Sequence, residues 1–148
     1  MGKPRYTVTL EDNAHPDNIQ VVLDGLSAYN RSQIGVDAGD NMKSLTLFVR
    51  DNNGTILGGL LGTTFWDWLH VSILWLHEDL RGQDLGTDLM MMAESEALRR
   101  GCHSAFVDTM SFQALPFYEK LGYTVYGQLD DFPTGYTRYF LKKQLRLA

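Results

Sequence analysis

Residues 74–89 read L-W-L-H-E-D-L-R-G-Q-D-L-G-T-D-L, and this stretch decides the fold. It starts with the hydrophobic pattern of a strand, passes through a glycine-containing turn at residues 81–86, and continues directly into a helix with periodic apolar residues. The first amides of a helix have no intrahelical acceptor, the helix dipole favours negative charge there, and glycine lets a phosphate approach the backbone. The stretch therefore predicts a phosphate-binding site where the helix begins.

The glycine spacing excludes two common phosphate-binding motifs. No Lys-Ser/Thr pair follows the second glycine, Gly86, as a P-loop requires. The dinucleotide-binding fingerprint needs three spaced glycines and an acidic residue about 20 positions later, which is not the pattern of this turn.

Alternating and helical hydrophobic patterns predict the other elements. Strands are expected over residues 5–11, 44–50, 55–64, 68–77, 102–110, 124–129 and 137–143. Helices are expected from residue 16 through Leu26, from residue 85 to a C-cap at Gly101, and over residues 114–121. The second of these should bury one face made of Leu85, Leu89, Met92, Ala93 and Ala97. Residues 30–41 are predicted to be a loop, and the whole order predicts an α/β fold with a mixed sheet.

The overall composition limits the class of protein. With 148 residues, 44% of them hydrophobic, we expect a single domain over residues 1–148. The formal charge of -5 argues against a nucleic-acid partner, which needs a basic surface. The single cysteine, Cys102, is expected to be a buried core residue. Because there is no signal-peptide pattern and no apolar span of about 18 residues, we predict a cytoplasmic, soluble protein that does not associate with a membrane.

Two motifs in this order resemble the GNAT superfamily of acyl-CoA-dependent N-acyltransferases. Arg81, Asp84 and Gly86 occupy the defined positions of its Arg/Gln-x-x-Gly-x-Gly/Ala signature, and Asp84 departs from the expected glycine. Residues 114–123, A-L-P-F-Y-E-K-L-G-Y, are similar to the family's A-x-x-F-Y-E-K-x-G-F/Y element. The resemblance covers roughly residues 43–143. It implies a sheet that is splayed between its fourth and fifth strands, here residues 68–77 and 102–110, with acyl-CoA in the gap.

The resemblance also implies how acetyl-CoA would bind, without a metal. It places pantetheine along the backbone of residues 74–76 and the pyrophosphate on the amides of residues 82–87. The expected cofactor-binding residues are Leu74, Trp75, Leu76, Arg81, Gly82, Gln83, Asp84, Leu85, Gly86, Thr87, Ser111 and Ala114.

Two of these residues differ from the family pattern. At Asp84 a carboxylate replaces the glycine, and it either faces the phosphates or caps the helix by accepting from the amide of Thr87; we expect the cap. Ser111 stands where family members usually carry asparagine, and its hydroxyl could cap the following helix and still reach the cofactor.

Acyl transfer requires an acid for the leaving thiolate and a route for the amine's proton. Tyr118 matches the family tyrosine near the CoA sulfur and is the predicted general acid; the alternative is an aromatic side chain that only packs on the helix. His70 is the candidate general base, against the alternatives of a structural histidine and of a water chain. Trp66 and Trp68 flank a turn at the expected acceptor end, where an amine cation could lie over an indole, unless they serve only in packing.

These observations predict a GNAT-fold N-acetyltransferase that moves an acetyl group from acetyl-CoA to a primary amine of a small molecule or peptide by direct attack. Two rivals stay open. One is a non-catalytic acyl-CoA-binding or regulatory module, and the other is a tRNA-acetylating toxin, which the acidic composition disfavours. The sequence identifies neither the acceptor amine nor the oligomeric state, and a homodimer is left open.

Overall fold

The computed structural model describes residues 2–3 and 5–146. They divide into two compact units, Met1–Asp40 and Asn41–Ala148, which we describe separately. The expectation of one domain over the whole chain therefore stays a prediction.

The first unit is built on one long helix, α1 (Pro16–Ile34). Proline suits the first turn because its missing N–H would have no partner there. The ring of His15 accepts from the amide of Asp17 before this turn, and Gly35 ends the helix in the left-handed conformation with φ of 81°. No residue of α1 is buried, and no apolar side chain is buried among the described residues of this unit.

Two predictions for the first unit are wrong. Residues 5–11 form no strand, although their hydrophobic pattern alternates. A strand needs a hydrogen-bonded neighbour, and the described residues of this unit contain none. The loop expected over residues 30–41 is shorter, because α1 continues to Ile34 before a short 3-10 turn at Ala38–Asp40.

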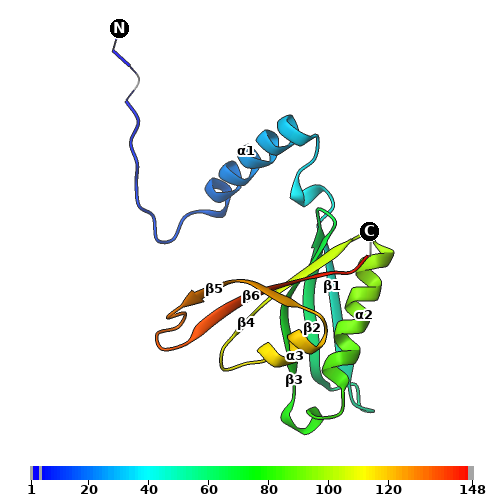
Figure 1. The fold of residues 1–148 in the computed structure, drawn as a ribbon. Coiled ribbons are helices and arrows are strands. Elements are labelled where there is room, and N and C mark those ends of the chain that lie inside the picture. Colours follow the sequence, from blue (N-terminus) through cyan, green and yellow to red (C-terminus); the bar gives the residue numbers. More distant parts are fainter. Residues whose placement is uncertain (1, 4, 147–148) are drawn as a thin grey trace. The chain divides into compact units, whose positions relative to one another are not determined.

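The second unit is a six-stranded mixed sheet (Figure 1) in the order β1-β2-β3-β4-β6-β5. Its strands are β1 (Lys43–Arg50), β2 (Ile56–Phe65), β3 (Trp68–Leu76), β4 (Ser104–Met110), β5 (Thr124–Asp130) and β6 (Thr137–Gln144). Its helices are α2 (Leu85–Arg99) and α3 (Leu115–Lys120), and a 3-10 turn lies at Glu78–Leu80. Only the β3–β4 pair is parallel. The α/β class and the predicted strands between residues 44 and 143 are confirmed.

The β3–β4 pairing is short, and this positions the site. Paired residues run from Trp68 opposite Ser104 to Val71 opposite Val107, whereas β3 continues to Leu76. On its other edge β3 pairs with β2 along its whole length, apart from a register shift that leaves Ser72 without a partner. Such a bulge bends and twists a strand. The backbone of β3 after Val71 is therefore not paired with β4.

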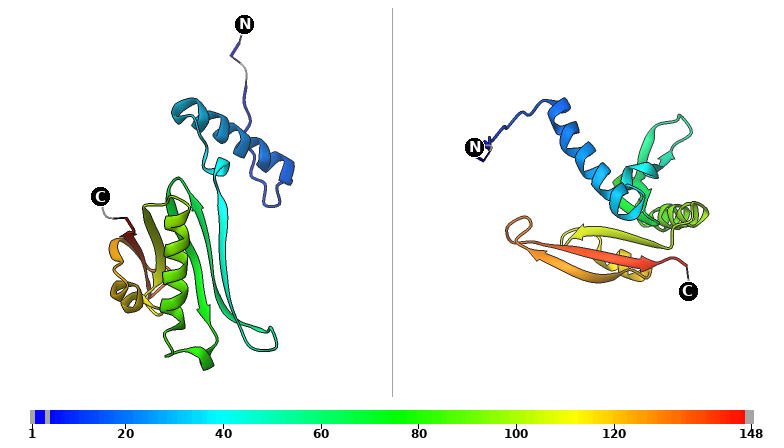
Figure 2. Two further views of the ribbon diagram at one scale, coloured as in Figure 1. Left: turned by 90° about the vertical axis from the view of Figure 1, so that its right-hand side faces the viewer. Right: turned by 90° about the horizontal axis from the view of Figure 1, so that it is seen from above.

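The core lies between the sheet and α2, which packs along β1, β2 and β3 (Figure 2). The buried residues are Leu45, Leu60, Leu69, Val71, Leu89, Met90, Ala93, Ala97, Cys102, Ala105, Val107, Tyr118, Tyr123 and Leu141. Cys102 is buried as predicted. The predicted face of α2 is wrong at Met92, which is exposed, because the helix turns Met90 into the core instead. Within the described residues, no helix has the length and apolar character to cross a membrane.

Candidate active site

A cavity of about 610 Å³ lies where β3 is no longer paired with β4. Residues 71–76 of β3 form one side, and Asp108 and Thr109 of β4 belong to the other. Arg81, residues 112–114 and Tyr118 complete the lining. Because one wall is strand backbone without a β4 partner, a ligand can hydrogen-bond to its free N–H and C=O groups.

A smaller cavity of about 270 Å³ is formed around the glycine turn. It shares Leu76 and Arg81 with the first cavity, and residues 84–87 line it together with Gly82 and Phe117. Nearly all predicted cofactor-binding residues therefore line one of these two adjoining cavities. The exceptions are Gln83, whose side chain donates to the carbonyl of Asp79, and Ser111.

The turn has the backbone geometry that an anion site needs. Gly82 has φ of 78°, a conformation that glycine adopts without steric cost. At Gly86 a Cβ atom would lie 3.3 Å from the ring of Phe117, so glycine keeps this helix start close to α3. Arg81 donates from Nε to the carbonyl of Leu76, 3.3 Å away, which fastens the turn to the end of β3.

The expected cap at Asp84 is not formed. Asp84 precedes α2 in the left-handed conformation, with φ of 62°, and its side chain makes no capping hydrogen bond. An N-cap side chain reaches the helix amides from an extended backbone, and the left-handed backbone directs it elsewhere. The same φ explains the family preference for glycine, because glycine alone adopts it freely.

Ser111 does not cap α3 either. Its hydroxyl accepts from the amide of Thr137, at 3.1 Å, and so joins the end of β4 to the start of β6. No side chain caps α3; the Oγ1 of Thr109 accepts from the amide of Ala114, the residue before the helix, at 3.3 Å. Gln113 accepts from that hydroxyl and from the amide of Met110, which closes the turn before α3.

Tyr118 combines burial with access to the cavity. Its side chain packs edge-on against Phe117 and Tyr123 and is 6% exposed, yet it lines the cavity. Burial, followed by the nearby charge of Asp108, raises the pKa of Tyr118 to about 12. The phenol therefore stays protonated throughout the neutral range and can act as a proton donor.

His70, near the start of β3, lies beside Asp108, and it is not itself among the residues that line the cavity of Tyr118. Its Nε2 is 4.0 Å from Oδ1 of Asp108, and its ring stacks on Phe106 at a centroid distance of 4.4 Å. Burial lowers the pKa of His70 below its ordinary value, and Asp108 opposes part of this effect. The imidazole is therefore neutral at neutral pH, as a general base must be.

Asp108 and Arg138 were not among the residues predicted from sequence. Asp108 lines the cavity and accepts two hydrogen bonds from Arg138, at 2.9 and 2.6 Å. The sequence does carry one signal for Asp108, because aspartate is unfavourable inside an apolar strand such as S-A-F-V-D-T-M. Arg138 has no comparable local signal, since its partner lies 30 positions away in the sequence.

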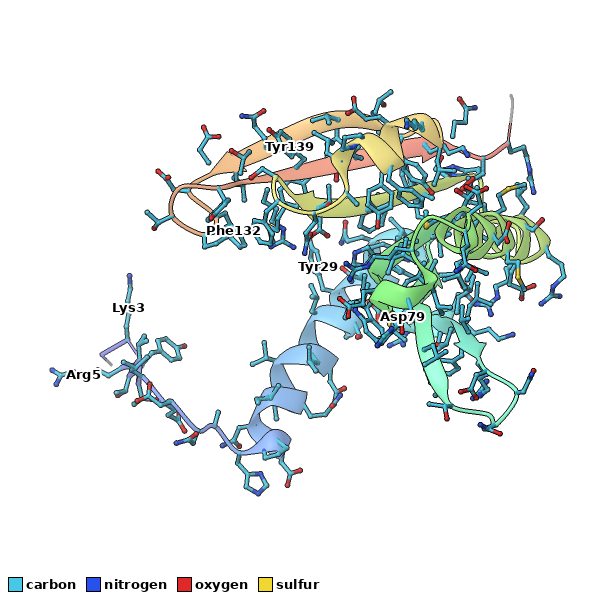
Figure 3. The ribbon with its side chains drawn as sticks, turned by 90° about the horizontal axis from the view of Figure 1, so that it is seen from below. Lys3, Arg5, Tyr29, Asp79, Phe132 and Tyr139 are labelled. Atoms are coloured by element: carbon cyan, nitrogen blue, oxygen red, sulfur yellow. The ribbon has the colours of Figure 1, made fainter. Side chains whose placement is uncertain are left out.

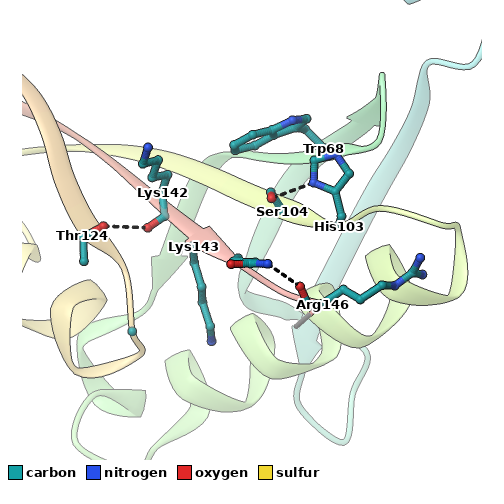
Figure 4. Close-up of a pocket in the computed structure, with 9 residues that line it drawn as sticks. Trp68, His103, Ser104, Thr124, Lys142, Lys143 and Arg146 are labelled. Carbon is teal, nitrogen blue, oxygen red and sulfur yellow. Dashed lines mark hydrogen bonds between the residues drawn. The ribbon is translucent and has the colours of Figure 1, made fainter. Parts of the chain in front are cut away.

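A separate cavity of about 700 Å³ lies near the beginning of β4 (Figure 4). Trp68, His103, Lys142 and Arg146 contribute to its lining, and none of the predicted catalytic or cofactor-binding residues does. The structure thus places Trp68 in this cavity and not in the cavity beside Tyr118. Trp66 lies in the β2–β3 turn and is also absent from that lining.

Comparisons with known proteins agree with this geometry. The model of the acetyltransferase (GNAT) family matches residues 16–123. The chain is 36% identical over 135 residues to acetyltransferase Atu2258 of Agrobacterium fabrum, covering 91% of this chain and 96% of that protein. It is 41% identical over 93 residues to blasticidin-S acetyltransferase of Streptomyces morookaense, covering 62% of this chain and 68% of that protein.

A crystal structure of an acetyltransferase from Bacillus cereus ATCC 14579 has the same fold. The TM-score is 0.82 at 31% identity, and the match covers 92% of this chain and 97% of that one. The strand, glycine turn and helix of residues 74–89, the Tyr118 segment and these matches lead to one conclusion: the chain belongs to the GNAT family of acetyltransferases.

Proposed function

We propose that this enzyme transfers the acetyl group of acetyl-CoA to a primary amine of a small molecule or peptide by direct attack. The observation that carries the proposal is the pair of adjoining cavities. One presents unpaired β3 backbone and the protonated Tyr118, and the other presents the helix start after the glycine turn. The relative named for acetylation of blasticidin S supports a small-molecule acceptor.

We infer that an acyl-CoA occupies the two adjoining cavities. We infer that the sheet is splayed where β3 and β4 are no longer paired, after Val71. In this gap the amides of pantetheine would hydrogen-bond to the backbone of residues 74–76. The pyrophosphate then lies on the amides of residues 82–87, where the helix dipole and free N–H groups favour an anion. This arrangement directs the thioester toward Tyr118.

The chemistry requires one proton acceptor and one proton donor. In our proposal His70 accepts the proton of the attacking amine, and Tyr118 donates to the thiolate that leaves as the C–S bond breaks. Cys102 is an unsuitable acyl carrier, because it is only 2% exposed and its burial, followed by the charge of Asp67, raises the pKa of its thiol. The burial of the only cysteine supports transfer without an acyl-cysteine intermediate.

The test is a screen of amines with acetyl-CoA, in which mass spectrometry detects acetylated product and a thiol reagent measures released CoA. The panel should contain blasticidin S, aminoglycosides, polyamines and peptides with free N-termini. We expect equal amounts of acetylated amine and CoA for at least one member, and no CoA release in a burst before the amine is added. A burst, or an acetylated protein isolated without amine, would contradict direct transfer.

A further inference from the structure

Three strands contribute one charged or titratable side chain each to a cluster beside the cavity. His70 comes from β3, Asp108 from β4 and Arg138 from β6. The two carboxylate oxygens of Asp108 have different neighbours. Oδ2 accepts from both Nε and a terminal nitrogen of Arg138, while Oδ1 is the atom 4.0 Å from Nε2 of His70. The second oxygen is therefore available to the imidazole.

Arg138 holds the carboxylate in this orientation. Its guanidinium lies 4.8 Å from the ring centre of Phe132, which belongs to the loop between β5 and β6 (Figure 3), and 5.3 Å from that of Phe140. Aromatic contacts of this kind restrict the guanidinium, and two hydrogen bonds to one oxygen then restrict the carboxylate. Asp108 is 20% exposed and Arg138 27% exposed, so solvent competes only partly for the pair.

The imidazole of His70 is restricted as well. Its ring is almost parallel to that of Phe106, with 3° between the planes, and Thr63 is its register partner on β2. The titratable group that faces it is Asp108 on β4, which pairs with Arg138 on β6 and, second to burial, also raises the pKa of Tyr118 on α3. A carboxylate facing Nε2 favours the tautomer with hydrogen on Nε2, which leaves the lone pair on Nδ1.

We propose that Asp108, anchored by Arg138, is a positioning residue that orients His70 and stabilises the imidazolium formed when His70 accepts the proton of the acceptor amine. This inference rests on the proposed function. As the amine nitrogen bonds to the thioester carbon and the C–S bond breaks, the nitrogen's proton passes to His70. The thiolate takes the phenolic proton of Tyr118, and both residues then return to their starting states by exchange with solvent. The net products are an amide and free CoA.

The experiment is a double-mutant cycle with Asp108→Asn, His70→Ala and the double variant, using an amine identified in the screen. Asp108→Asn should lower kcat/KM by at least about 10-fold, because general base catalysis contributes about 10²- to 10⁴-fold in total. It should also move the rising limb of kcat/KM to lower pH, since the charge that favours the imidazolium is gone. In the His70→Ala background the same substitution should change kcat/KM by less than about 2-fold.

Controls separate positioning from a general loss of structure. Arg138→Lys keeps both charges but loses the paired hydrogen bonds, so it should lower kcat by a smaller factor and leave the KM for acetyl-CoA unchanged. Lys142→Met is the matched control, because Lys142 is also on β6 and lies over an aromatic ring, that of Tyr126, but forms no ion pair with a carboxylate of the described residues. We expect wild-type kinetics for it.

The pKa of His70 can be measured in the resting enzyme by NMR, with His70→Ala identifying the resonance. Asp108→Asn should lower this pKa, and Lys142→Met should not. Additive losses in the cycle, or an unchanged His70 pKa in Asp108→Asn, would overturn the proposal. If the wild-type enzyme acetylates no amine, the proposed function fails, whereas the NMR titration still decides whether Asp108 controls the imidazole.

Discussion

At the scale of single residues, Tyr118 has an environment that keeps its proton. The pKa of about 12 makes the phenol a weaker acid than free tyrosine, so the developing thiolate must be close enough to receive a hydrogen bond as its charge forms. Tyr123 is the neighbouring buried tyrosine, but its hydroxyl donates to Glu94 at 3.4 Å. Tyr118 lines the cavity, whereas Tyr123 is buried in the core. Tyr123 can therefore serve as the control for substitutions of Tyr118.

We predict that Tyr118→Phe lowers kcat roughly 10²-fold, with little change in the affinity for acetyl-CoA, because only the proton donor is lost. Tyr123→Phe should keep its kcat and lose about 1 kcal/mol of unfolding free energy, since a hydrogen bond to Glu94 disappears. Steady-state kinetics and thermal melts of both variants provide the measurement. Unchanged turnover in Tyr118→Phe would remove this residue from the mechanism.

The placement of a residue beside a cavity was predictable where a local motif carried it, as at Tyr118, Arg81 and Gly86. It was not predictable for Asp108 and Arg138, because their ion pair joins strands that meet only through the order β4-β6 in the folded sheet. The capping roles were also missed. Side-chain oxygens at Asp84 and Ser111 suit helix starts, but backbone angles and the neighbouring Thr137 decide which amides they reach.

At the scale of elements, the turn before α2 has an unusual residue in its left-handed position. From the sequence we expected Asp84 to stabilise the helix as a cap, but in the structure its side chain makes no capping hydrogen bond. Without the cap, Asp84 brings a charge to the cavity of the glycine turn and has a backbone conformation that disfavours a side chain.

We therefore predict that Asp84→Gly keeps or raises the melting temperature of the cofactor-free enzyme and tightens acetyl-CoA binding several-fold at low salt. Asp84→Ala should also bind acetyl-CoA more tightly but should melt lower, because alanine in the left-handed region costs about 1 kcal/mol. The affinity gain should shrink as salt rises. Calorimetry at two salt concentrations tests this, and weaker acetyl-CoA binding by Asp84→Gly would show that the aspartate helps to form the site.

The hydrophobic patterns predicted the strands of the second unit well. Most pairs join sequence neighbours or, for β3 and β4, the two strands of one βαβ crossover, and only the β4–β6 pair skips a strand. The same alternation failed at residues 5–11, since alternation alone does not supply a partner strand. The short β3–β4 pairing could not be read from hydrophobicity either. The extent of this pairing depends on the strand register and on the bulge at Ser72, and neither can be predicted from the pattern of apolar residues.

At the scale of the whole molecule, the described residues line more than one cavity in which a ligand of moderate size fits. The paired cavities near Tyr118 and the glycine turn contain the family motifs. The cavity near Trp68, His103 and Lys142 is larger than either, and its described lining includes basic residues but no acidic one. If single-cavity volume were the only criterion, the cavity near Trp68 would be the candidate active site. The backbone geometry of the glycine turn and the position of Tyr118 favour the two adjoining cavities instead.

The most direct test of this choice is an NMR titration of the enzyme with CoA, followed through the backbone amides. We predict the largest shifts at residues 74–76 and 82–87, with the Tyr118 ring also affected, because these groups line the two adjoining cavities. Shifts concentrated instead at Trp68, His103 and Lys142, with residues 82–87 unchanged, would contradict the account.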